Sequence, residues 1–338
     1  MTARRWKWIG VLLMLCMCAA CGSDEVKDQT SSAQILNQVA DVAREESVEE
    51  EPLPEPQVLA RRSDNVNAVI SWSPVEGADG YVIYRAEAAA GPYITIGFVT
   101  GTTRELTDKY LETDKTYYYQ AQAYQEDGTE RLYGMMSAAV SVTMPAYEGF
   151  FHDEDGALYC YQDNQLVRDQ EIGYLYFDKS GRYTSGDEAL DLYLREVTAA
   201  CIDDSMTQVE QFHAVYDWVI ENCSYVAMQY LEAGSKGWEP DLALYMFEHL
   251  EGNCYYYAAI VTMLGRNVGM QAYGVMGQCH QTYMWVAHGW CEVEYEGQEY
   301  LVDAEMEGVF AADEGWEWDQ FMREYGTTVP TYEKYEGY

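Results

Sequence analysis

The sequence predicts an all-β sandwich followed by an α+β domain, in one chain of 338 residues. That length exceeds one average domain and suits two domains with added segments. The first observation is that apolar residues alternate in short runs across 58–145, with turn residues such as GADG (77–80) between the runs. The second is that apolar residues recur at helical spacing from residue 187, before two further strands within 284–305. Hydrophobic residues make up 48% of the chain, so a sizeable core can form.

The N-terminal stretch predicts a secretory signal peptide over residues 1–21. A basic start, ARRWK (3–7), precedes an apolar run at 9–17 that is too short for a stable membrane span. The following CAACGS (18–23) resembles the lipobox of bacterial lipoproteins, which implies cleavage before Cys21 and a lipid on its sulfur. Cys18 stands where leucine is usual, and the alternative is an ordinary secreted protein cleaved nearby. We therefore expect an extracytoplasmic protein, anchored by lipid to a bacterial cell membrane.

Residues 22–57 predict a disordered, acidic tether. They are polar and end in EESVEEEPLPEPQ (45–57), a composition that buries too little apolar surface to offset the entropy lost on ordering. The formal net charge of the chain is −37, which argues against nucleic-acid binding and against charge-driven docking on anionic lipid. The expected membrane contact is the lipid on Cys21.

The nine cysteines predict no dense disulfide framework. Cys16 and Cys18 leave with the signal peptide, and Cys21 and Cys254 have separate predicted roles. The five that remain cannot all pair, and their spacing is unlike that of a disulfide scaffold, although one or two bridges stay open.

Residues 58–145 predict a β-sandwich of about seven short strands. Apolar positions alternate in VNAVISW (66–72) and again in YYYQAQAY (117–124). The segment resembles a fibronectin type III domain, through Trp72 in VISW, Tyr81 in GYVIYR and TYYYQAQA (116–123). That resemblance implies that Tyr117 makes a corner bond to the backbone. Such domains are usually spacers or adhesive modules, so we expect no catalytic role for this one.

Residues 146–186 predict successive β-hairpins. Aromatic strands alternate with Asp-, Asn- and Gly-bearing turns in GALYCYQDNQLVRDQ (156–170) and GYLYFDKSGRYTSG (173–186). The pattern resembles degenerate units of the aromatic repeats in Gram-positive cell-wall-binding proteins. We favour the alternative, a β-extension packed on the next domain, because a wall-binding array needs several repeats to bury a continuous core.

Residues 187–338 predict a helical region followed by a sheet. Ser205-Met-Thr-Gln208 has a capping-box pattern, which predicts the start of a helix there. Gly252 and Asn253 then end a short helix that begins near Pro240. Cys254 comes next, in the first turn of another helix, where free N–H groups and the macrodipole favour a thiolate. Position alone is weak evidence, because free cysteines are commonly small core residues.

Two strands around a turn at Glu296-Gly297 supply partners for this cysteine. If those two residues form the loop, Asp303 lies opposite Trp290, and His288 becomes its diagonal neighbour on the same face. A three-residue loop would instead send Asp303 to the other face. The two-residue turn therefore permits an imidazole oriented by a carboxylate.

These residues together resemble the transglutaminase-like superfamily of bacterial proteins, over roughly 188–310. The matching motifs are Gly252-x-Cys254, His288-Gly-Trp290 and Val302-Asp303, in that order, with Tyr225 in NCSY as an upstream match. The resemblance implies a papain-like α+β fold, in which a helix carrying the cysteine packs on an antiparallel sheet carrying the histidine and aspartate. Ala304 departs from the proline found after the aspartate in many members.

The resemblance and the chemistry of these groups suggest their roles. Cys254 would be the nucleophile, His288 its ion-pair partner and proton donor, and Asp303 the group that orients the imidazole. The backbone N–H of Cys254 is one expected oxyanion donor. Further candidates for the oxyanion site or the cleft are Asn253, Tyr225, Gln278, His280 and Trp290.

We expect no metal and no cofactor. Cys279, His280, His288 and Cys291 suggest zinc by composition. His288 and Cys291 differ by three positions along a strand, so they face opposite sides, and no C-x-x-C pair occurs after the predicted signal peptide to support a closed site.

The sequence therefore predicts a surface-anchored cysteine enzyme that acts on peptide or side-chain amide bonds through an acyl-enzyme. The acceptor, water or an amine, stays open, so peptidase, amidase and transamidase activities all remain. The expected substrate is a protein or a peptidoglycan peptide near the membrane. The alternative is a non-catalytic binding or assembly protein of the cell surface, which would use the fibronectin-like and hairpin modules.

Overall fold

The computed structural model describes residues 51–203, 205–281, 283–310, 319–328 and 330–336. The predicted signal peptide, the lipidation site at Cys21 and the tether up to residue 50 lie outside these residues. No helix in the described ranges combines the length and the apolar composition that crossing a membrane requires.

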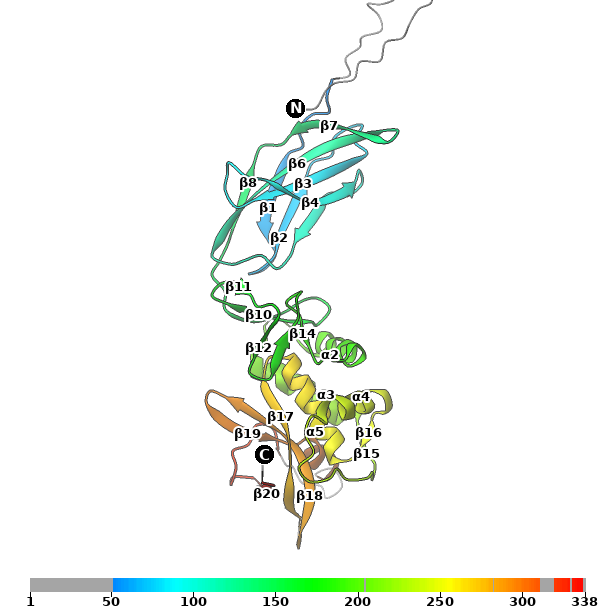
Figure 1. The fold of residues 1–338 in the computed structure, drawn as a ribbon, viewed down its shortest axis with the longest axis vertical. Helices are drawn as coiled ribbons and strands as arrows, with labels where there is room; N and C mark the ends of the chain where they lie inside the picture. The colour runs from blue at the N-terminus through cyan, green and yellow to red at the C-terminus, as the bar shows by residue number, and fades with distance from the viewer. Residues whose placement is uncertain (1–50, 204, 282, 311–318, 329, 337–338) are drawn as a thin grey trace, which may run out of the picture. The chain divides into compact units, whose positions relative to one another are not determined.

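The N-terminal part is a β-sandwich of two sheets (Figure 1). One sheet has the order β1-β2-β5, formed by Val58–Arg62, Ala68–Trp72 and Glu105–Asp108. The other has the order β4-β3-β6-β7, with β8 also paired to β6. Its strands are Ile94–Thr100 (β4), Gly80–Ala86 (β3), Lys115–Asp127 (β6), Glu130–Met136 (β7) and Val140–Met144 (β8). The alternating burial along β6 shows the period of two that the sequence predicted.

Two details of the sandwich concern expectations from the sequence. The Tyr117 hydroxyl donates to the carbonyl of Glu112 at 3.3 Å, which confirms the predicted corner bond. Leu53 packs against the sandwich core, and its carbonyl accepts from the N–H of Met135 at 2.8 Å. Ordered contacts therefore begin within the segment that the sequence assigns to the tether.

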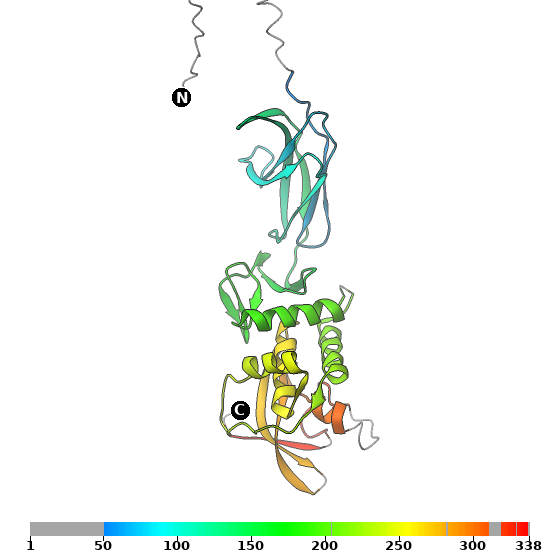
Figure 2. The same ribbon diagram turned by 90° about the vertical axis from the view of Figure 1, so that its right-hand side faces the viewer.

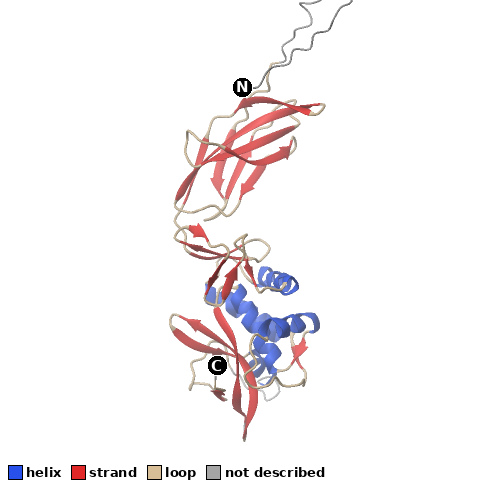
Figure 3. Ribbon diagram, viewed as in Figure 1, coloured by secondary structure: helices blue, strands red, loops and turns tan. Residues whose placement is uncertain are grey.

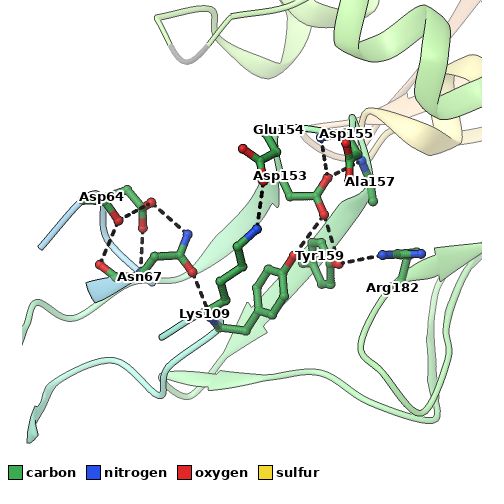
Figure 4. A network of polar contacts seen from close by, with 11 residues as sticks. Asp64, Asn67, Lys109, Asp153, Glu154, Asp155, Ala157, Tyr159 and Arg182 are labelled. Atoms are coloured by element: carbon green, nitrogen blue, oxygen red, sulfur yellow. Dashed lines mark hydrogen bonds and ion pairs between the residues drawn. The ribbon is translucent and has the colours of Figure 1, made fainter. Parts of the chain in front are cut away.

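The hairpin segment comprises β9 to β14, at Gly149–His152, Leu158–Gln162, Gln165–Leu166, Gln170–Ile172, Leu175–Phe177 and Tyr183–Thr184. Its apolar side chains belong to the core of the C-terminal domain, as an extension of that domain would require. Asp153 in this segment accepts hydrogen bonds from the hydroxyls of Tyr110 at 2.9 Å and Tyr159 at 3.2 Å (Figure 4). Lys109 and Glu154 form an ion pair beside them. These contacts join the hairpin segment to the loop after β5.

Among the described residues, helices occur only in the C-terminal domain (Figure 3). They are α2 (Glu188–Cys201), α3 (Gln208–Asn222), α4 (Glu239–His249), α5 (Cys254–Asn267) and a π-helical turn at Met306–Phe310. The antiparallel sheet has the order β19-β18-β17-β20, at Gln298–Val302, Met284–Tyr295, Gln271–Gln281 and Thr331–Lys334. Two short strands, Ser224–Tyr225 (β15) and Glu251–Gly252 (β16), pair in parallel, and β16 comes directly before α5 in the chain. Helix α5 packs on β17 and β18 (Figures 1 and 2).

The predicted capping box is wrong in its position. The N-cap of α3 is Thr207, whose hydroxyl accepts from the N–H of Glu210, while the Glu210 carboxylate accepts from the N–H of Thr207 at 2.8 Å. The Ser205 hydroxyl bonds instead to Asp203. A carboxylate is the stronger acceptor for a backbone donor, so the Thr207-Glu210 pair outcompetes the predicted Ser205-Gln208 pair.

Candidate active site

Cys254 lies at the N-terminus of α5, as the sequence predicted. Asn253 is the N-cap, and its side-chain oxygen accepts from the N–H of Tyr255 at 3.2 Å. The thiol is buried, and the helix that carries it is buried along nearly its whole length. A thiol here meets the positive end of the macrodipole and the unpaired N–H groups of the first turn, both of which favour the thiolate.

The turn between β18 and β19 sets the position of Asp303. Glu296 and Gly297 both have positive φ, at 52° and 77°, and Tyr295 pairs with Gln298, so the loop has two residues. The register continues to Cys291 opposite Val302. Asp303 therefore follows on the side of His288, and its Oδ2 lies 2.6 Å from His288 Nε2. The diagonal pairing predicted from the turn is the one observed.

Asp303 is held by two further hydrogen bonds. The Tyr332 hydroxyl, on β20, donates to the same Oδ2 at 2.8 Å. The N–H of Met306 donates to Oδ1 at 3.1 Å. The carboxylate is 2% exposed, so these donors replace the solvation that it loses on burial.

Cys254 is close enough to His288 to influence the pKa of the imidazole. Burial alone lowers the pKa of His288, but the negative charges of Asp303 and of a Cys254 thiolate, with the hydrogen bonds to both, outweigh it and raise the pKa well above its usual value. The charged imidazolium is thereby favoured. An imidazolium beside a helix N-terminus is the partner that a nucleophilic thiolate needs.

Glu305 is a second buried carboxyl group at this histidine, and the sequence argument missed it. Its Oε2 lies 3.7 Å from His288 Nδ1, and the residue is 2% exposed. Burial raises the pKa of Glu305 to about 7, with the positive charge of His288 acting against this and the charge of Asp303 adding to it. The only sequence signal is a second acidic residue two positions after Asp303.

His288, Asp303 and Glu305 each offer one ligand atom, and these atoms lie within 4.8 Å of one another. Three such side chains could in principle ligate a cation. However, Asp303 Oδ2 is already shared between His288 Nε2 and the Tyr332 hydroxyl, and 2.6 Å between Oδ2 and Nε2 leaves no room for an ion between those atoms. The arrangement fits a hydrogen-bonded acid–base pair better than a metal centre.

Three of the five additional candidates lie at the site. Asn253 is fully buried and caps α5, while its amide also donates to the carbonyl of Met228 at 3.4 Å. Tyr225 lies on β15, where burial, followed by Tyr230 and the charges of Glu305 and Cys254, raises its pKa to about 12. Trp290 stacks against the imidazole of His288, with ring centroids 6.2 Å apart.

The structure does not bring Gln278 and His280 to the cysteine. Gln278 follows Gly277, which is opposite His288, so its side chain points to the other face of the sheet and donates to Glu333 at 2.9 Å. His280 lies opposite Trp285, three residues or about 10 Å along β18 from His288, and packs edge-on against that tryptophan. Both predictions neglected the alternation and the length of the strands.

Comparison with known proteins identifies the domain that holds this site. Residues 195–304 match the model of the transglutaminase-like superfamily. The N-terminal region is similar to solved fibronectin type III structures. An Fn3-like protein from Clostridium thermocellum is 26% identical and covers 29% of this chain and 99% of its own, with a TM-score of 0.25. The fn3 domain of human collagen alpha-1(XX) chain is 21% identical and covers 30% and 95%, with a TM-score of 0.24. No curated protein matches the sequence.

The described chain thus has an all-β sandwich followed by a transglutaminase-like domain of helices and strands, the fold order that the sequence predicted. Members of the transglutaminase-like superfamily are usually cysteine enzymes.

Proposed function

We propose that this transglutaminase-like chain is a cysteine enzyme that cleaves amide bonds through an acyl-enzyme on Cys254. One observation carries the proposal: a buried thiol at a helix N-terminus lies near an imidazole that a buried carboxylate holds at 2.6 Å. Nucleophile, base and orienting group thus form one connected line.

The proposed reaction begins with attack of the Cys254 thiolate on the carbonyl carbon of the amide. A C–S bond forms, and the π electrons move to the oxygen, where the N–H of Cys254 is one donor and the Tyr225 hydroxyl is the candidate for another. When the carbonyl re-forms, the C–N bond breaks and the amine leaves with the proton of His288. Asp303 stabilises the imidazolium before this transfer.

The thioester is then attacked by water or by an amine. His288, now neutral, takes the proton of the attacking group, the C–S bond breaks, and the thiolate is regenerated with its imidazolium partner. Hydrolysis gives a peptidase or an amidase, and attack by an amine gives a transamidase. The three activities share the thioester, which makes it the intermediate to trap first.

We further propose that the enzyme works outside the cytoplasm, held at a bacterial cell membrane by a lipid on Cys21. The sequence supports this with a signal-peptide pattern that ends in CAACGS (18–23). An acidic segment between the lipid and the sandwich would keep the enzyme near the membrane, where proteins and peptidoglycan peptides are the candidate substrates.

Selective alkylation tests the proposal. The purified protein without its signal peptide is treated with limiting iodoacetamide between pH 4 and 9, and modified cysteines are located by mass spectrometry. We expect Cys254 to be alkylated in preference to the other cysteines, and His288→Ala to abolish this preference. Cys223 is an internal control, because burial raises the pKa of its thiol to about 12.

If Cys254 reacts like an ordinary thiol in both proteins, the enzymatic proposal fails. The alternative, a binding protein of the cell surface, would then be the function to pursue through its sandwich and hairpin modules.

A further inference from the structure

One edge of β18 is unpaired where the strand approaches His288. On this side β19 accompanies β18 only from Tyr295 to Cys291, and Val302 is its last paired residue. On the other side β17 accompanies β18 along its whole length, to Met284. In the described part of the chain, no strand covers the β19-side edge between Met284 and Trp290. Figure 1 shows the β17–β18 hairpin running past β19.

Backbone hydrogen bonds at β19 fix which groups point to this edge. Leu301 exchanges two backbone hydrogen bonds with Arg323, each 2.8 Å long, so its N–H and C=O point away from β18. The backbone N–H and C=O of its neighbour Val302 therefore point toward Cys291 on β18. Alternate residues of a regular strand point to the same edge. Beyond the end of β19, the residues whose backbone groups point the same way as those of Cys291 are Gly289, Ala287 and Trp285.

The hydrogen bonds between β17 and β20 give the same orientation for the backbone groups of β18. The N–H of Tyr335 donates to the carbonyl of Met276 at 3.0 Å, so Met276 points toward the β20 side. Met276 lies opposite Gly289, and a residue that points to β20 does not exchange backbone bonds with β18. Gly289 therefore points to the edge that β19 leaves open, in agreement with the pattern at Leu301.

This edge leads from solvent to the nucleophile. Met284 and Trp285 are 65% and 38% exposed, and Ala287 is also exposed. The next residue, His288, is buried and close enough to Cys254 for the two to influence each other's charge. A Cβ added to Gly289 would lie 2.5 Å from the ring of Tyr255, so the first turn of α5 abuts the strand at this point. A chain that followed the edge from Trp285 would reach the thiol.

We infer that the acyl donor binds as an extended peptide segment that adds a strand to β18 at Trp285 and Ala287. The inference rests on the proposed function and specifies its substrate class. Open backbone N–H and C=O groups are satisfied by another extended chain about 4.8 Å away, and such pairing gives affinity through the main chain. Unfolded tails, linkers and loops can adopt this form, whereas a helix cannot. The net charge of −37 favours neutral or basic segments over acidic ones.

A backbone scan of a peptide probe tests the inference on the unmodified enzyme. The probe is a blocked hexapeptide with a C-terminal chloromethyl ketone, whose rate of alkylation of Cys254 is compared with that of iodoacetamide. A series of probes carries one N-methyl group at each successive residue. We expect alternate positions to lower the rate about tenfold each, because only alternate N–H groups of an added strand face β18. The positions between them should have little effect.

A matched pair of variants tests the edge itself. Ala287→Pro removes the outward N–H at a position where an edge strand tolerates proline, and Ala287→Ser keeps it. We expect Ala287→Pro to slow the peptide probe about tenfold and to leave the iodoacetamide rate unchanged, while Ala287→Ser leaves both unchanged.

The outcomes separate the two proposals. If iodoacetamide shows no activated thiolate, the proposed function fails. If the thiolate is activated but N-methylation shows no alternation and Ala287→Pro binds the probe normally, the added strand is overturned and the proposed function stands. If the wild type sediments as a dimer and Ala287→Pro as a monomer, the edge is an interface between copies, which also overturns the peptide inference.

Discussion

Tyr332 and His288 bond to the same oxygen atom of Asp303, at 2.8 and 2.6 Å. The tyrosine comes from β20, 29 residues after Asp303, so the orienting carboxylate is itself oriented by a distant part of the chain. Hydrogen-bond donors that contact a catalytic side chain, and not the substrate, hold that side chain in its productive position. Their loss weakens catalysis without removing a reacting atom.

We predict that Tyr332→Phe lowers kcat/KM about tenfold, because a hydrogen bond to a buried carboxylate contributes about 1.5–3 kcal/mol. Steady-state kinetics with an amide substrate would measure this, alongside the melting temperature. Tyr300→Phe, on β19, is the control, since none of the described hydrogen bonds joins its hydroxyl to the site. Equal activity of both variants would show that Tyr332 does not support Asp303.

From the burial of Glu305 we predict that the free energy of unfolding depends on pH. Burial raises the pKa of this carboxyl from 4.5 to about 7, so between these values the folded state keeps a proton that the unfolded state releases. The free energy of unfolding therefore falls as pH rises through this window. His288 affects stability in a different pH range. Its pKa is raised, so its contribution to the free energy of unfolding is complete below about pH 6.5 and is lost only at higher pH.

The test is Glu305→Gln, which cannot ionise. Urea unfolding at pH 5 and pH 6.5 should show a smaller fall in unfolding free energy for the variant than for the wild type. Glu333→Gln provides the control for loss of a carboxyl group, because Glu333 is an exposed residue of β20. An unchanged difference between the two pH values in Glu305→Gln would mean that Glu305 is ionised throughout.

We predict that removing the charge of Lys334 lowers the stability of the fold. Its Nζ lies 2.7 Å from Glu292, whose side chain is fully buried and also accepts from the hydroxyls of Tyr325 and Tyr273. Lys334→Met leaves that charge without its cation, which we expect to cost about 2 kcal/mol, because Lys334 is itself partly exposed. Urea unfolding would measure the loss. The double variant with Glu292→Gln should recover part of it, and an additive double variant would contradict the pairing.

The position of Gly252, two residues before the proposed nucleophile Cys254, leaves no room for a side chain. A Cβ at this position would lie 2.4 Å from the Cβ of Tyr256 and 3.1 Å from the sulfur of Met246. Gly252→Ala must therefore shift the first turn of α5, at a cost of about 1–3 kcal/mol, and move Cys254 away from His288. We expect slower alkylation of Cys254 in the folded variant. Gly297→Ala is a control, because space is open there although its positive φ is disfavoured. Unchanged alkylation in Gly252→Ala would refute the requirement.

The sequence could predict the centre of the site because local rules determine it. A glycine in a two-residue turn fixed the register of β18 and β19, and the register placed Asp303 beside His288. The start of a buried helix placed Cys254. These arguments need only the periods of strands and helices and the chemistry of turns.

The rest depended on contacts between distant segments. Tyr332 follows Asp303 after a stretch with no clear period, so nothing local indicated that its strand pairs with β17. Glu305 resembled a surface carboxylate, and only the fold buries it. Gln278 and His280 failed for a simpler reason, since strand alternation already placed Gln278 on the face opposite to His288, and strand length already separated His280 from that histidine.

The position of β20 also implies an order of maturation. A chain that emerges N-terminus first presents Cys254 and His288 before Tyr332 and Lys334 have left the ribosome. Until β20 adds to β17, Asp303 lacks one of its donors and Glu292 lacks its cation. Under the proposed function, full reactivity of the thiol would thus arise only after the C-terminal domain has closed its sheet, and an incomplete chain would not attack its own unfolded segments.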